Sequence, residues 1–475
     1  MTPRTLYEKL CDSHTVRQLS SSGKILLYID RTVLNEYTSP QAFGGLREAG
    51  RKCWRPQASL AVVDHVNPTT ARRTATIDDI EAANQVKYFE GNCTDFNIEL
   101  FDILDRRQGI EHVVAPELGF ILPGMVVAAG DSHTATYGAL GALGFGIGTS
   151  DIEHYLATQT LVYQKLKTMR IAVEGKLFPG ITAKDVVMAV IRKIGASGAV
   201  GYAVEFSGSA IMDLSIEGRM TICNMIVEGG ARGVVMAVDD KLLDYLKGRP
   251  RVPTGAAWEA AVASWAQLKS DPDALFDREV VLQAKDIEPM VTWGTSPDQA
   301  EPVGSIVPDP MRETDPARQR DMVRALDYMG LSAGTALRDI RIDVAFIGSC
   351  TNARLEDLRA AASIIGNRKV ADGVRAMIVP GSTAVRDQAQ AEGLADIFVN
   401  AGFEWRQSGC SLCLAMNDDV LKPGQRCASS TNRNFEGRQG AGARTHLMSP
   451  VMVTAAALSG HIADAREFSV SQGRI

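Results

Sequence analysis

Short runs rich in β-branched residues alternate with helical patterns along the whole chain, and this alternation limits the fold more than any other feature. ILLYID (25–30), SLAVVDH (59–65) and GMVVAAGDSHT (124–134) are typical of strands, whereas TSPQAFGGLREAG (38–50) has helical spacing after a Thr-Ser cap. Further strand-like runs are MRIAVEG (169–175), IDVAFIGSC (342–350), RAMIVPGS (375–382) and ADIFVNAG (395–402). The alternation predicts an α/β fold in which ligands bind where strands end.

The length indicates several domains, because single hydrophobic cores stop growing near roughly 250–300 residues and this chain has 475. The stretch 288–316 is dense in Pro, Asp and Gly and cannot sustain a long helix or a central strand, so it predicts a connection. Helical patterns at 182–194 and 220–230 precede it. We therefore expect three α/β domains, over residues 1–165, 166–305 and 306–475.

Composition narrows the class of protein. The net charge of −6 provides no basic field for a phosphate backbone, which makes nucleic acid an unlikely partner. We see neither a secretion signal nor an apolar run long enough to span a membrane. Eight cysteines are too few for a disulfide framework in a chain of this length. A cytoplasmic protein with thiols available for a metal is expected.

Three cysteines have a spacing that suits a metal centre. Cys410 and Cys413 form a CxxC, and Cys350 follows the strand-like run that ends in GSC. The pair could be a redox dithiol, half of a zinc site or two buried thiols, whereas three thiolates would suit an iron–sulfur cluster with one open iron. Spacing alone leaves these interpretations open, with Cys223 and Cys427 as candidates for a fourth ligand.

Four of the seven histidines have polar or acidic neighbours at predicted strand ends. An adjacent carboxylate can orient the imidazole and raise its basicity, which suits general acid catalysis. For any one of them, a histidine satisfied by local hydrogen bonds is the alternative, and we keep that interpretation for the one on a predicted helix face, His154. The other three are His65, His112 and His133.

A turn-like segment after the CxxC contains two arginines. Arg433 and Arg438 lie in NRNFEGR (432–438), where a glycine separates them. Two guanidinium groups can bind two carboxylates of one ligand, although a solvated loop is the alternative.

Taken together, these motifs resemble the aconitase superfamily, and within it the large subunits of the isopropylmalate isomerases. The likeness rests on GSCTN, GCSLCLAMN, NRNFEGR, GDSHT and VDH, and it runs over nearly the whole chain. Several long motifs in one order are highly specific. It implies an aconitase-like fold of three α/β domains around a central iron–sulfur cluster. It also implies a lyase that isomerises a small hydroxy-dicarboxylate by removing water and adding it back, as in leucine biosynthesis.

The resemblance assigns roles by matching motif. It implies a [4Fe-4S] cluster with one open iron, ligated by Cys350, Cys410 and Cys413. Residues implied near the cluster are Asn224 and Asn432. The implied catalytic residues are Asp64, His65, His112, Asp131, His133 and Glu228. The implied substrate-binding residues are Gln41, Ser132, Arg433 and Arg438.

The resemblance also implies a partner, because single-chain relatives draw a serine base and further arginines from a fourth domain. In the two-chain enzymes a separate small subunit of the swivelling-domain type supplies these groups, and we expect the same here. Three departures from the family pattern, at Val66-Asn67, Ala353 and Thr383, leave room for a paralogue acting on methylmalate, dimethylmalate or homocitrate. An RNA-binding iron sensor and a scaffold without a cluster are weaker alternatives.

Overall fold

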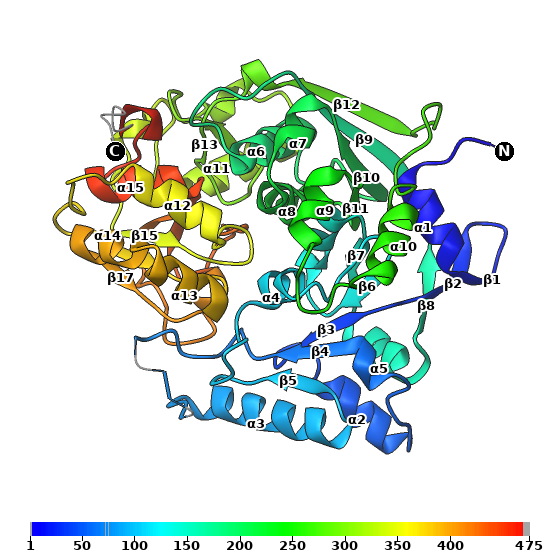
Figure 1. Cartoon of the computed structure of the whole chain (residues 1–475). Helices are drawn as coiled ribbons and strands as arrows, with labels where there is room; N and C mark the ends of the chain where they lie inside the picture. The colour runs from blue at the N-terminus through cyan, green and yellow to red at the C-terminus, as the bar shows by residue number, and fades with distance from the viewer. Residues whose placement is uncertain (1, 72, 75, 469–475) are drawn as a thin grey trace. The chain divides into compact units, whose positions relative to one another are not determined.

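The structure is a computed structural model that describes residues 2–71, 73–74 and 76–468 (Figure 1). The chain forms two compact units. Unit 1 comprises Met1–Asp64, Ala75–Lys176 and Ala199–Lys285, and unit 2 comprises His65–Thr74, Leu177–Gly198 and Asp286–Ile475. The three domains expected over 1–165, 166–305 and 306–475 stay a prediction.

A six-stranded sheet forms the centre of unit 1. Its strands are parallel except at one junction, where β11 and β7 run antiparallel. The order is β12 (Arg278–Gln283), β9 (Lys167–Glu174), β10 (Tyr202–Ser207), β11 (Gly233–Met236), β7 (Leu143–Gly146) and β6 (Val126–Ala129). The chain leaves β6 directly into the GDSHT motif, so this strand end carries Asp131 and His133.

A smaller parallel sheet in unit 1 contains β3 (Thr32–Asn35), β4 (Ser59–Val62) and β5 (Glu99–Phe101). All residues of β3 and β4 are buried, which fits the mainly apolar sequences TVLN and SLAV. Helix α3 (Ile80–Asp95) lies along β5, next to α2 (Pro40–Glu48) (Figure 1). An antiparallel sheet of β1 (Thr15–Gln18), β2 (Lys24–Tyr28) and β8 (Thr160–Gln164) completes the strands of unit 1.

The 3₁₀ helix η2 (Ser132–Leu140) follows β6 and packs on β7 and β11. Two glycines make this packing close. A Cβ on Gly138 would collide with the carbonyl oxygen of Val234, and one on Gly144 would collide with that of Thr134. Backbone therefore lies directly against backbone beneath His133.

A five-stranded, fully parallel sheet forms the centre of unit 2. Helix α15 (Pro450–Ser459) packs on β15 and β18, and α14 (Leu394–Ala401) packs on β17. The strand order is β17 (Phe403–Trp405), β16 (Arg375–Ile378), β15 (Val344–Ile347), β18 (Arg426–Ser429) and β19 (Arg444–Leu447). Because all strands point the same way, the segments that follow them meet at one edge of the sheet.

The stretch 288–316 is a connection, as predicted. It contains the short hairpin of β13 (Met290–Thr292) and β14 (Ala300–Pro302) and the 3₁₀ helix η5 (Pro310–Arg312). The hairpin packs against α6 (Ala183–Ile194), the helix expected at 182–194.

The remaining helices connect these sheets. They are α1 (Leu6–His14), α4 (Glu111–Glu117), α5 (Thr149–Thr158), α7 (Ser209–Asp213), α8 (Ile216–Met225), α9 (Asp240–Leu246), α10 (Ala256–Trp265), α11 (Pro316–Met329), α12 (Leu355–Ser363) and α13 (Thr383–Ala391). The shorter 3₁₀ helices are η1 (Pro56–Ala58), η3 (Ile226–Gly229), η4 (Ala284–Asp286), η6 (Leu337–Asp339), η7 (Ser411–Cys413) and η8 (Ala465–Phe468). Within the described part of the chain, every helix is too short or too polar to cross a bilayer.

Two expectations about individual elements are wrong. The run 395–402 is not a strand but most of α14, with glycines in the left-handed region at both ends. His112 and His154 do not follow strands either, since they lie on α4 and α5. His154 is exposed on α5, and a helix is where we expected it.

Candidate functional site

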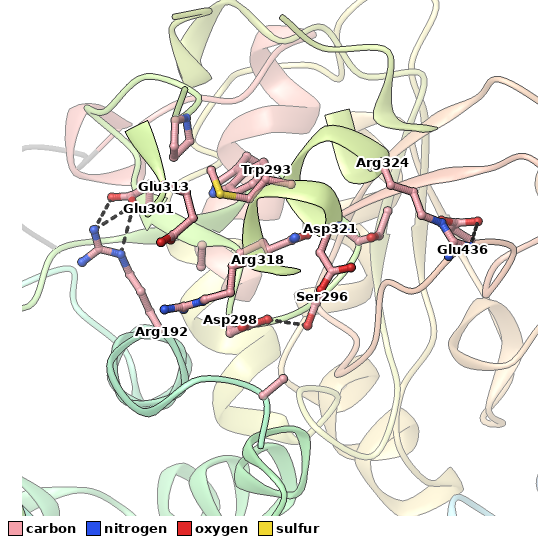
Figure 2. Close-up of a pocket in the computed structure, with 16 residues that line it drawn as sticks. Arg192, Trp293, Ser296, Asp298, Glu301, Glu313, Arg318, Asp321, Arg324 and Glu436 are labelled. Atoms are coloured by element: carbon pink, nitrogen blue, oxygen red, sulfur yellow. Dashed lines mark hydrogen bonds and ion pairs between the residues drawn. The ribbon is translucent and has the colours of Figure 1, made fainter. Parts of the chain in front are cut away.

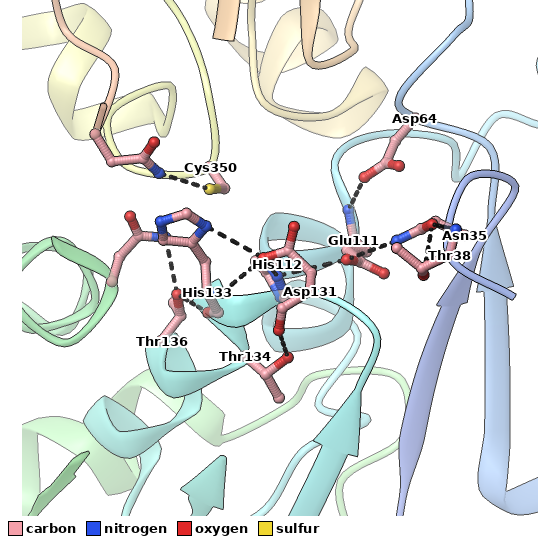
Figure 3. Close-up of polar contacts among 12 residues, drawn as sticks. Asn35, Thr38, Asp64, Glu111, His112, Asp131, His133, Thr134, Thr136 and Cys350 are labelled. Carbon is pink, nitrogen blue, oxygen red and sulfur yellow. Dashed lines mark hydrogen bonds and ion pairs between the residues drawn. The ribbon is translucent and has the colours of Figure 1, made fainter. Parts of the chain in front are cut away.

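Four ionisable side chains form a continuous series of contacts in unit 1, and Figure 3 shows three of them, His112, Asp131 and His133. His112 Nε2 lies 3.1 Å from Asp131 Oδ1, and His133 Nδ1 lies 3.2 Å from the same oxygen. His133 Nε2 then lies 3.2 Å from Glu228 Oε1. Both histidines are buried, and two carboxylates fix their ring orientation, which is the arrangement that general acid–base catalysis requires.

Asp131 is the centre of this chain because one of its oxygens accepts three hydrogen bonds. Besides the two imidazoles, the backbone N–H of His133 donates to Oδ1 at 2.6 Å. Burial acts to raise the pKa of Asp131, but the hydrogen bonds from His112 and His133 outweigh it and hold that pKa well below its usual value. Asp131 is therefore a fixed negative charge that orients both rings.

The far nitrogen of His112 is also satisfied. Its Nδ1 lies 3.0 Å from the hydroxyl of Tyr137, which is buried on η2. A hydroxyl that donates to Nδ1 leaves Nε2 as the protonated nitrogen facing Asp131, so the contacts favour one neutral tautomer of His112.

Asp64 follows β4 and is anchored from two sides within unit 1. Its Oδ2 accepts from the backbone N–H of Glu111 at 2.8 Å, and its own N–H donates to Glu36 Oε2 at 3.2 Å. Glu111 is buried next to His112, and its Oε1 accepts from Asn35 Nδ2 at 3.2 Å (Figure 3). The carboxylates of Asp64 and Glu111 are therefore held by backbone and amide donors.

Helix α8 positions two further predicted residues. Asn224 is fully buried, and its Nδ2 donates to Thr136 Oγ1 of η2 at 3.0 Å. Glu228 lies one turn later, on η3, where it contacts His133. Cys223, a candidate fourth ligand, is buried within the same helix, where burial raises the pKa of its thiol.

The three predicted metal ligands all follow strands of the parallel sheet in unit 2. Cys350 comes after β15, whereas Cys410 and Cys413 come after β17. All three are buried, and the N–H of Cys413 donates to the carbonyl of Cys410 at 2.9 Å, which closes the CxxC turn. Cys427, the other candidate ligand, lies inside β18 in an apolar cluster with Val344 and Leu412 and is a core residue.

Asn432 connects two of these cysteines. It follows β18, is fully buried, and its Nδ2 lies 3.6 Å from Cys350 Sγ. Its Oδ1 lies 3.8 Å from Cys413 Sγ. One amide thus spans two sulfurs that are far apart in the sequence.

Backbone strain occurs next to the cysteines, directly before Cys350 and directly after Cys410. Ser349 has a φ of 78° and Ser411 has a φ of 49°, in the left-handed region that non-glycine residues rarely adopt. Strain of this kind persists only where the surroundings enforce it, and it concentrates at binding sites. Three cysteine thiols on such loops are a donor set that fits an iron–sulfur cluster.

A polar network holds the CxxC loop in unit 2. Asn67 Nδ2 donates to the carbonyl of Ser408 at 3.0 Å, and Asn417 Nδ2 donates to the carbonyl of Asn67 at 3.0 Å. Asp419 accepts from Ser411 Oγ at 2.6 Å and pairs with Arg406. Asn67, one of the departures from the family pattern, therefore supports the loop and faces no open space.

Lys184 is an unexpected charge in this region. It lies on α6, is 1% exposed, and donates to the carbonyls of Ser430 and Thr431. Burial lowers the pKa of Lys184 to about 7, although the charges of Asp357 and Cys413 act in the opposite direction.

The other predicted residues are less constrained. His65 is buried at the start of unit 2, and Gln41 is exposed on α2. Arg433 and Arg438 are half-buried on the loop after β18, and the guanidinium of Arg438 lies 5.3 Å from the ring centroid of Phe435. Ser132 is half-buried at the start of η2.

A separate cavity of about 540 Å³ lies in unit 2 and contains none of these residues (Figure 2). Several of its polar side chains form ion pairs or hydrogen bonds with one another. Arg192 contacts Glu301 at 2.7 Å, Arg324 contacts Glu436 at 2.9 Å, and Ser296 Oγ donates to Asp298 at 2.5 Å. The cavity offers no histidine or cysteine for chemistry.

Sequence reasoning missed several residues that hold the site together. Tyr137 was part of a Gly-rich run that indicated only core, and Lys184 was part of a helical pattern. A lysine in the apolar run AKDVVMAVI was the one visible signal, because lysine is almost never fully buried. Asn35 and Glu111 gave no signal, since their partners lie far away in the sequence.

Comparisons with known proteins agree with the motifs. A family model described as aconitase family (aconitate hydratase) matches residues 8–460. The proteins named 3-isopropylmalate dehydratase large subunit 2 from Salmonella choleraesuis and Salmonella typhimurium are each 62% identical over 466 residues, which cover 98% of this chain and 98% of theirs. 3-isopropylmalate dehydratase large subunit 1 from Mannheimia succiniciproducens is 62% identical over 465 residues, with the same coverage. Among solved structures, holo aconitase X from Thermococcus kodakaraensis matches with a TM-score of 0.46 and 13% identity, over 90% of this chain and 88% of that one.

Proposed function

The chain belongs to the aconitase family, and from this premise we propose that it is the large subunit of a hydro-lyase that isomerises 2-isopropylmalate to 3-isopropylmalate. The reaction removes water and adds it back at the neighbouring carbon, a step of leucine biosynthesis. Identity of 62% over 98% of the chain supports this substrate. The observation that carries the chemistry is that Cys350, Cys413 and the Asn432 amide converge after strands of one parallel sheet.

Membership of the family implies an iron–sulfur cluster, and we propose a [4Fe-4S] cluster held by Cys350, Cys410 and Cys413. Three cysteines leave one iron without a protein ligand. When bound, the cluster supplies a Lewis acid for the substrate hydroxyl and a neighbouring carboxylate. Asn432 supports the two sulfurs that it contacts, as hydrogen bonds to cluster sulfurs do in general.

The chain's own residues bind and orient the substrate and move protons. Arg433 and Arg438 bind its carboxylates, because a guanidinium matches a carboxylate with two parallel hydrogen bonds. Gln41 and Ser132 provide further polar contacts to the substrate. His65, adjacent to Asp64 in sequence, donates a proton to the departing hydroxyl.

The four side chains in contact, His112, Asp131, His133 and Glu228, hold the other protons that the proposed reaction moves. Asp131 fixes both rings, while Glu228 faces the outer nitrogen of His133. Asn224 fixes η2 through Thr136 and thereby supports His133. Each positioned acid or base of this kind contributes roughly 10²–10⁴-fold to a rate.

A partner subunit is part of this proposal. The curated relatives are named as large subunits, which implies a small subunit in those enzymes. We propose that a small subunit of the swivelling-domain type binds this chain and supplies the base that removes the proton from carbon. A cytoplasmic location, where thiols stay reduced, fits this chemistry.

The test measures the activity of the reconstituted protein on several substrates. The chain is reconstituted anaerobically with iron and sulfide, mixed with a small subunit, and assayed by ultraviolet absorbance of the unsaturated intermediate. The substrates are 2-isopropylmalate, methylmalate, dimethylmalate, homocitrate and citrate. We expect 2-isopropylmalate to give the highest kcat/KM. A higher value with another diacid would assign the chain to a paralogue with that substrate.

A pair of variants tests the ligands. Cys410→Ser should lose the visible absorbance of the cluster and the activity while keeping the circular dichroism of the folded chain. Cys427→Ser, a core cysteine in β18, serves as the matched control and should keep the cluster. A full cluster in Cys410→Ser would show that the ligand assignment is wrong.

A further inference from the structure

Lys184 is a buried cation with neutral hydrogen-bond partners. Its side chain is 1% exposed, and its Nζ donates to the carbonyl of Thr431 at 2.5 Å and to that of Ser430. In the described part of the chain, it forms no ion pair with a carboxylate. An ammonium buried in this way is costly unless a negative charge compensates it, so its presence on α6 calls for a compensating group.

The carboxylates that act on Lys184 are already engaged elsewhere. Asp357 accepts from Asn352 Nδ2 and from the N–H of Arg354, both at 3.0 Å. Asp185 accepts from the N–H of Thr182 and from that of Met290, both at 2.8 Å.

Two of the predicted cluster ligands, Cys413 and Cys350, also act electrostatically on Lys184. Cysteine ligands of a cluster are thiolates, so a bound cluster would place negative charge where this lysine lacks it.

The position of Lys184 also connects it to the cysteine loops. The carbonyls that it holds belong to the two residues directly before Asn432, whose amide spans Cys350 and Cys413. Ser430 in turn bridges to the other loop, since its Oγ lies 3.1 Å from both the N–H and the carbonyl of Gly348. Strands β15 and β18 are neighbours, so these two loops leave the sheet side by side.

Helix α6 fixes the lysine in this place. A capping box closes its N-terminus, with Thr182 and Asp185 as reciprocal partners. The second oxygen of Asp185 accepts from Met290 and ties the helix to the β13–β14 hairpin. The ammonium therefore projects from a rigid first turn and not from a mobile loop.

From these contacts we propose that Lys184 is a positioning residue for the iron–sulfur cluster. Its ammonium holds the turn that extends Asn432 between two cluster ligands, and its charge stabilises the reduced, more negative form of the cluster. This inference rests on the proposed function, which supplies the cluster.

The test separates the effect of the charge of the Lys184 side chain from the effect of its shape. Lys184→Met keeps an unbranched apolar stem but lacks the ammonium, so the charge is lost, whereas Lys184→Arg keeps the charge. Lys193→Met, an exposed lysine on the same helix, is the matched control. After anaerobic reconstitution, iron and sulfide per chain, the midpoint potential by dye-mediated titration, and the rate of cluster loss in air are measured.

We expect Lys184→Met to bind iron. At a given potential, the ratio of oxidised to reduced cluster should be about tenfold higher than in the wild type, which corresponds to a midpoint potential lower by about 59 mV for a one-electron couple. Its cluster should also be lost faster in air, because the turn that carries Asn432 no longer has the ammonium that holds it. Lys184→Arg and Lys193→Met should keep the potential of the wild type. An unchanged potential and loss rate in Lys184→Met would overturn the proposal.

Folding is checked separately. If Lys184→Met does not fold, Lys184→Gln replaces it, because its amide can still donate to the two carbonyls while carrying no charge. Failure of both uncharged variants to fold would mean that the lysine serves the fold itself, and the proposal would be wrong. Absence of iron in the reconstituted wild type would instead contradict the proposed function, so the two failures are distinguishable.

Discussion

At the scale of single residues, several side chains of the candidate site each contact two partners. Asp131 uses one oxygen to orient His112 and His133, and Tyr137 fixes the far nitrogen of His112. Asn432 uses both ends of its amide on two sulfurs. Such residues determine orientation, so isosteric substitutions are expected to affect rate more than stability.

His65 provides a first prediction at this scale. His65→Ala should lower turnover by roughly 10²–10⁴-fold, the usual contribution of one positioned acid, while the iron content stays unchanged. Steady-state kinetics and iron analysis of the reconstituted enzyme check it. His154→Ala removes an exposed histidine and should leave turnover unaltered. An equal rate in both variants would reduce His65 to a structural role.

His446 gives a prediction about pH. Burial lowers its pKa from 6.5 to about 3, and the neighbouring Arg426 acts in the same direction. Its Nδ1 lies 2.6 Å from the carbonyl of Thr292 and its Nε2 lies 2.8 Å from Arg426 Nη1, so the neutral ring is satisfied on both sides. Because the pKa is lower in the folded than in the unfolded chain, the unfolded chain binds more protons as the pH falls. The stability due to neutral His446 is therefore present above about pH 6.5 and is lost toward pH 3.

Between pH 6.5 and 5.5 we expect this residue to remove about 1 kcal/mol from the free energy of unfolding, since one pKa unit corresponds to about 1.4 kcal/mol. Urea unfolding of the cluster-free chain at both pH values measures it. His446→Gln should have a shallower pH dependence than the wild type, and His154→Gln should match the wild type. Parallel pH dependence in all three would contradict the assignment.

At the scale of elements, the sequence predicted most strands and helices because their periodicity was undisturbed. Strands β2, β4, β6, β9, β15 and β16 and helices α2, α6 and α8 lie where they were expected. Helix α14 was missed because exposed Ile397 and Val399 made its sequence look like a strand. Its buried residues Leu394, Ala395, Phe398 and Ala401 follow helical spacing, which the apolar exposed residues concealed.

For the site, the motifs single out the residues to which we assign roles, but not those that hold them in place. Cys350, His133 and Arg433 lie in distinctive local sequences. Tyr137, Lys184 and Asn35 become informative only when the fold brings partners from distant segments, and local patterns carry no trace of such pairs. The roles of the acting residues stay predictions that the experiments above address.

Helix α8 offers a prediction about one element. Arg219 is fully buried on α8, and its Nη2 donates to Asp239 Oδ2 at 2.6 Å, while Asp239 Oδ1 caps α9 by accepting from Leu242 at 3.1 Å. Asp239→Ala leaves a buried guanidinium without its carboxylate, which should lower the free energy of unfolding by about 3–5 kcal/mol. Denaturant unfolding checks this. Asp240→Ala, an exposed acid in the first turn of α9, should cost less than about 1 kcal/mol.

At the scale of the whole molecule, the two compact units carry different parts of the chemistry. Unit 1 holds Asp131, His112, His133 and Glu228, whereas unit 2 holds the three cysteines and both arginines. Each part is well ordered by its own sheet and its own polar contacts. The proposed reaction therefore draws on residues of both units, together with the base that we assign to a partner.

The partner gives the prediction at this scale. The reconstituted chain alone should show little dehydratase activity, because a proton must be taken from carbon by a group that we assign to the small subunit. Activity should rise on adding small subunit and saturate near one per large chain, measured by titration at fixed large-chain concentration. A small subunit with its proposed serine base replaced by alanine is the control and should bind without restoring activity. Full turnover of the chain alone, free of any second polypeptide, would point to a base within this sequence.

The glycines beneath η2 bear on how this scaffold could be redirected to other hydroxy-acids. Gly138 and Gly144 admit no side chain, since a methyl group at either position would collide with a backbone carbonyl. A mutational library aimed at the floor under His133 would therefore yield mostly misfolded chains and no new selectivity. Diversity has to enter through the side chains that we propose to contact the substrate, such as Gln41 and Ser132, or through the proposed partner. The platform that holds the proton-transfer groups and the surface that selects the substrate can thus change independently.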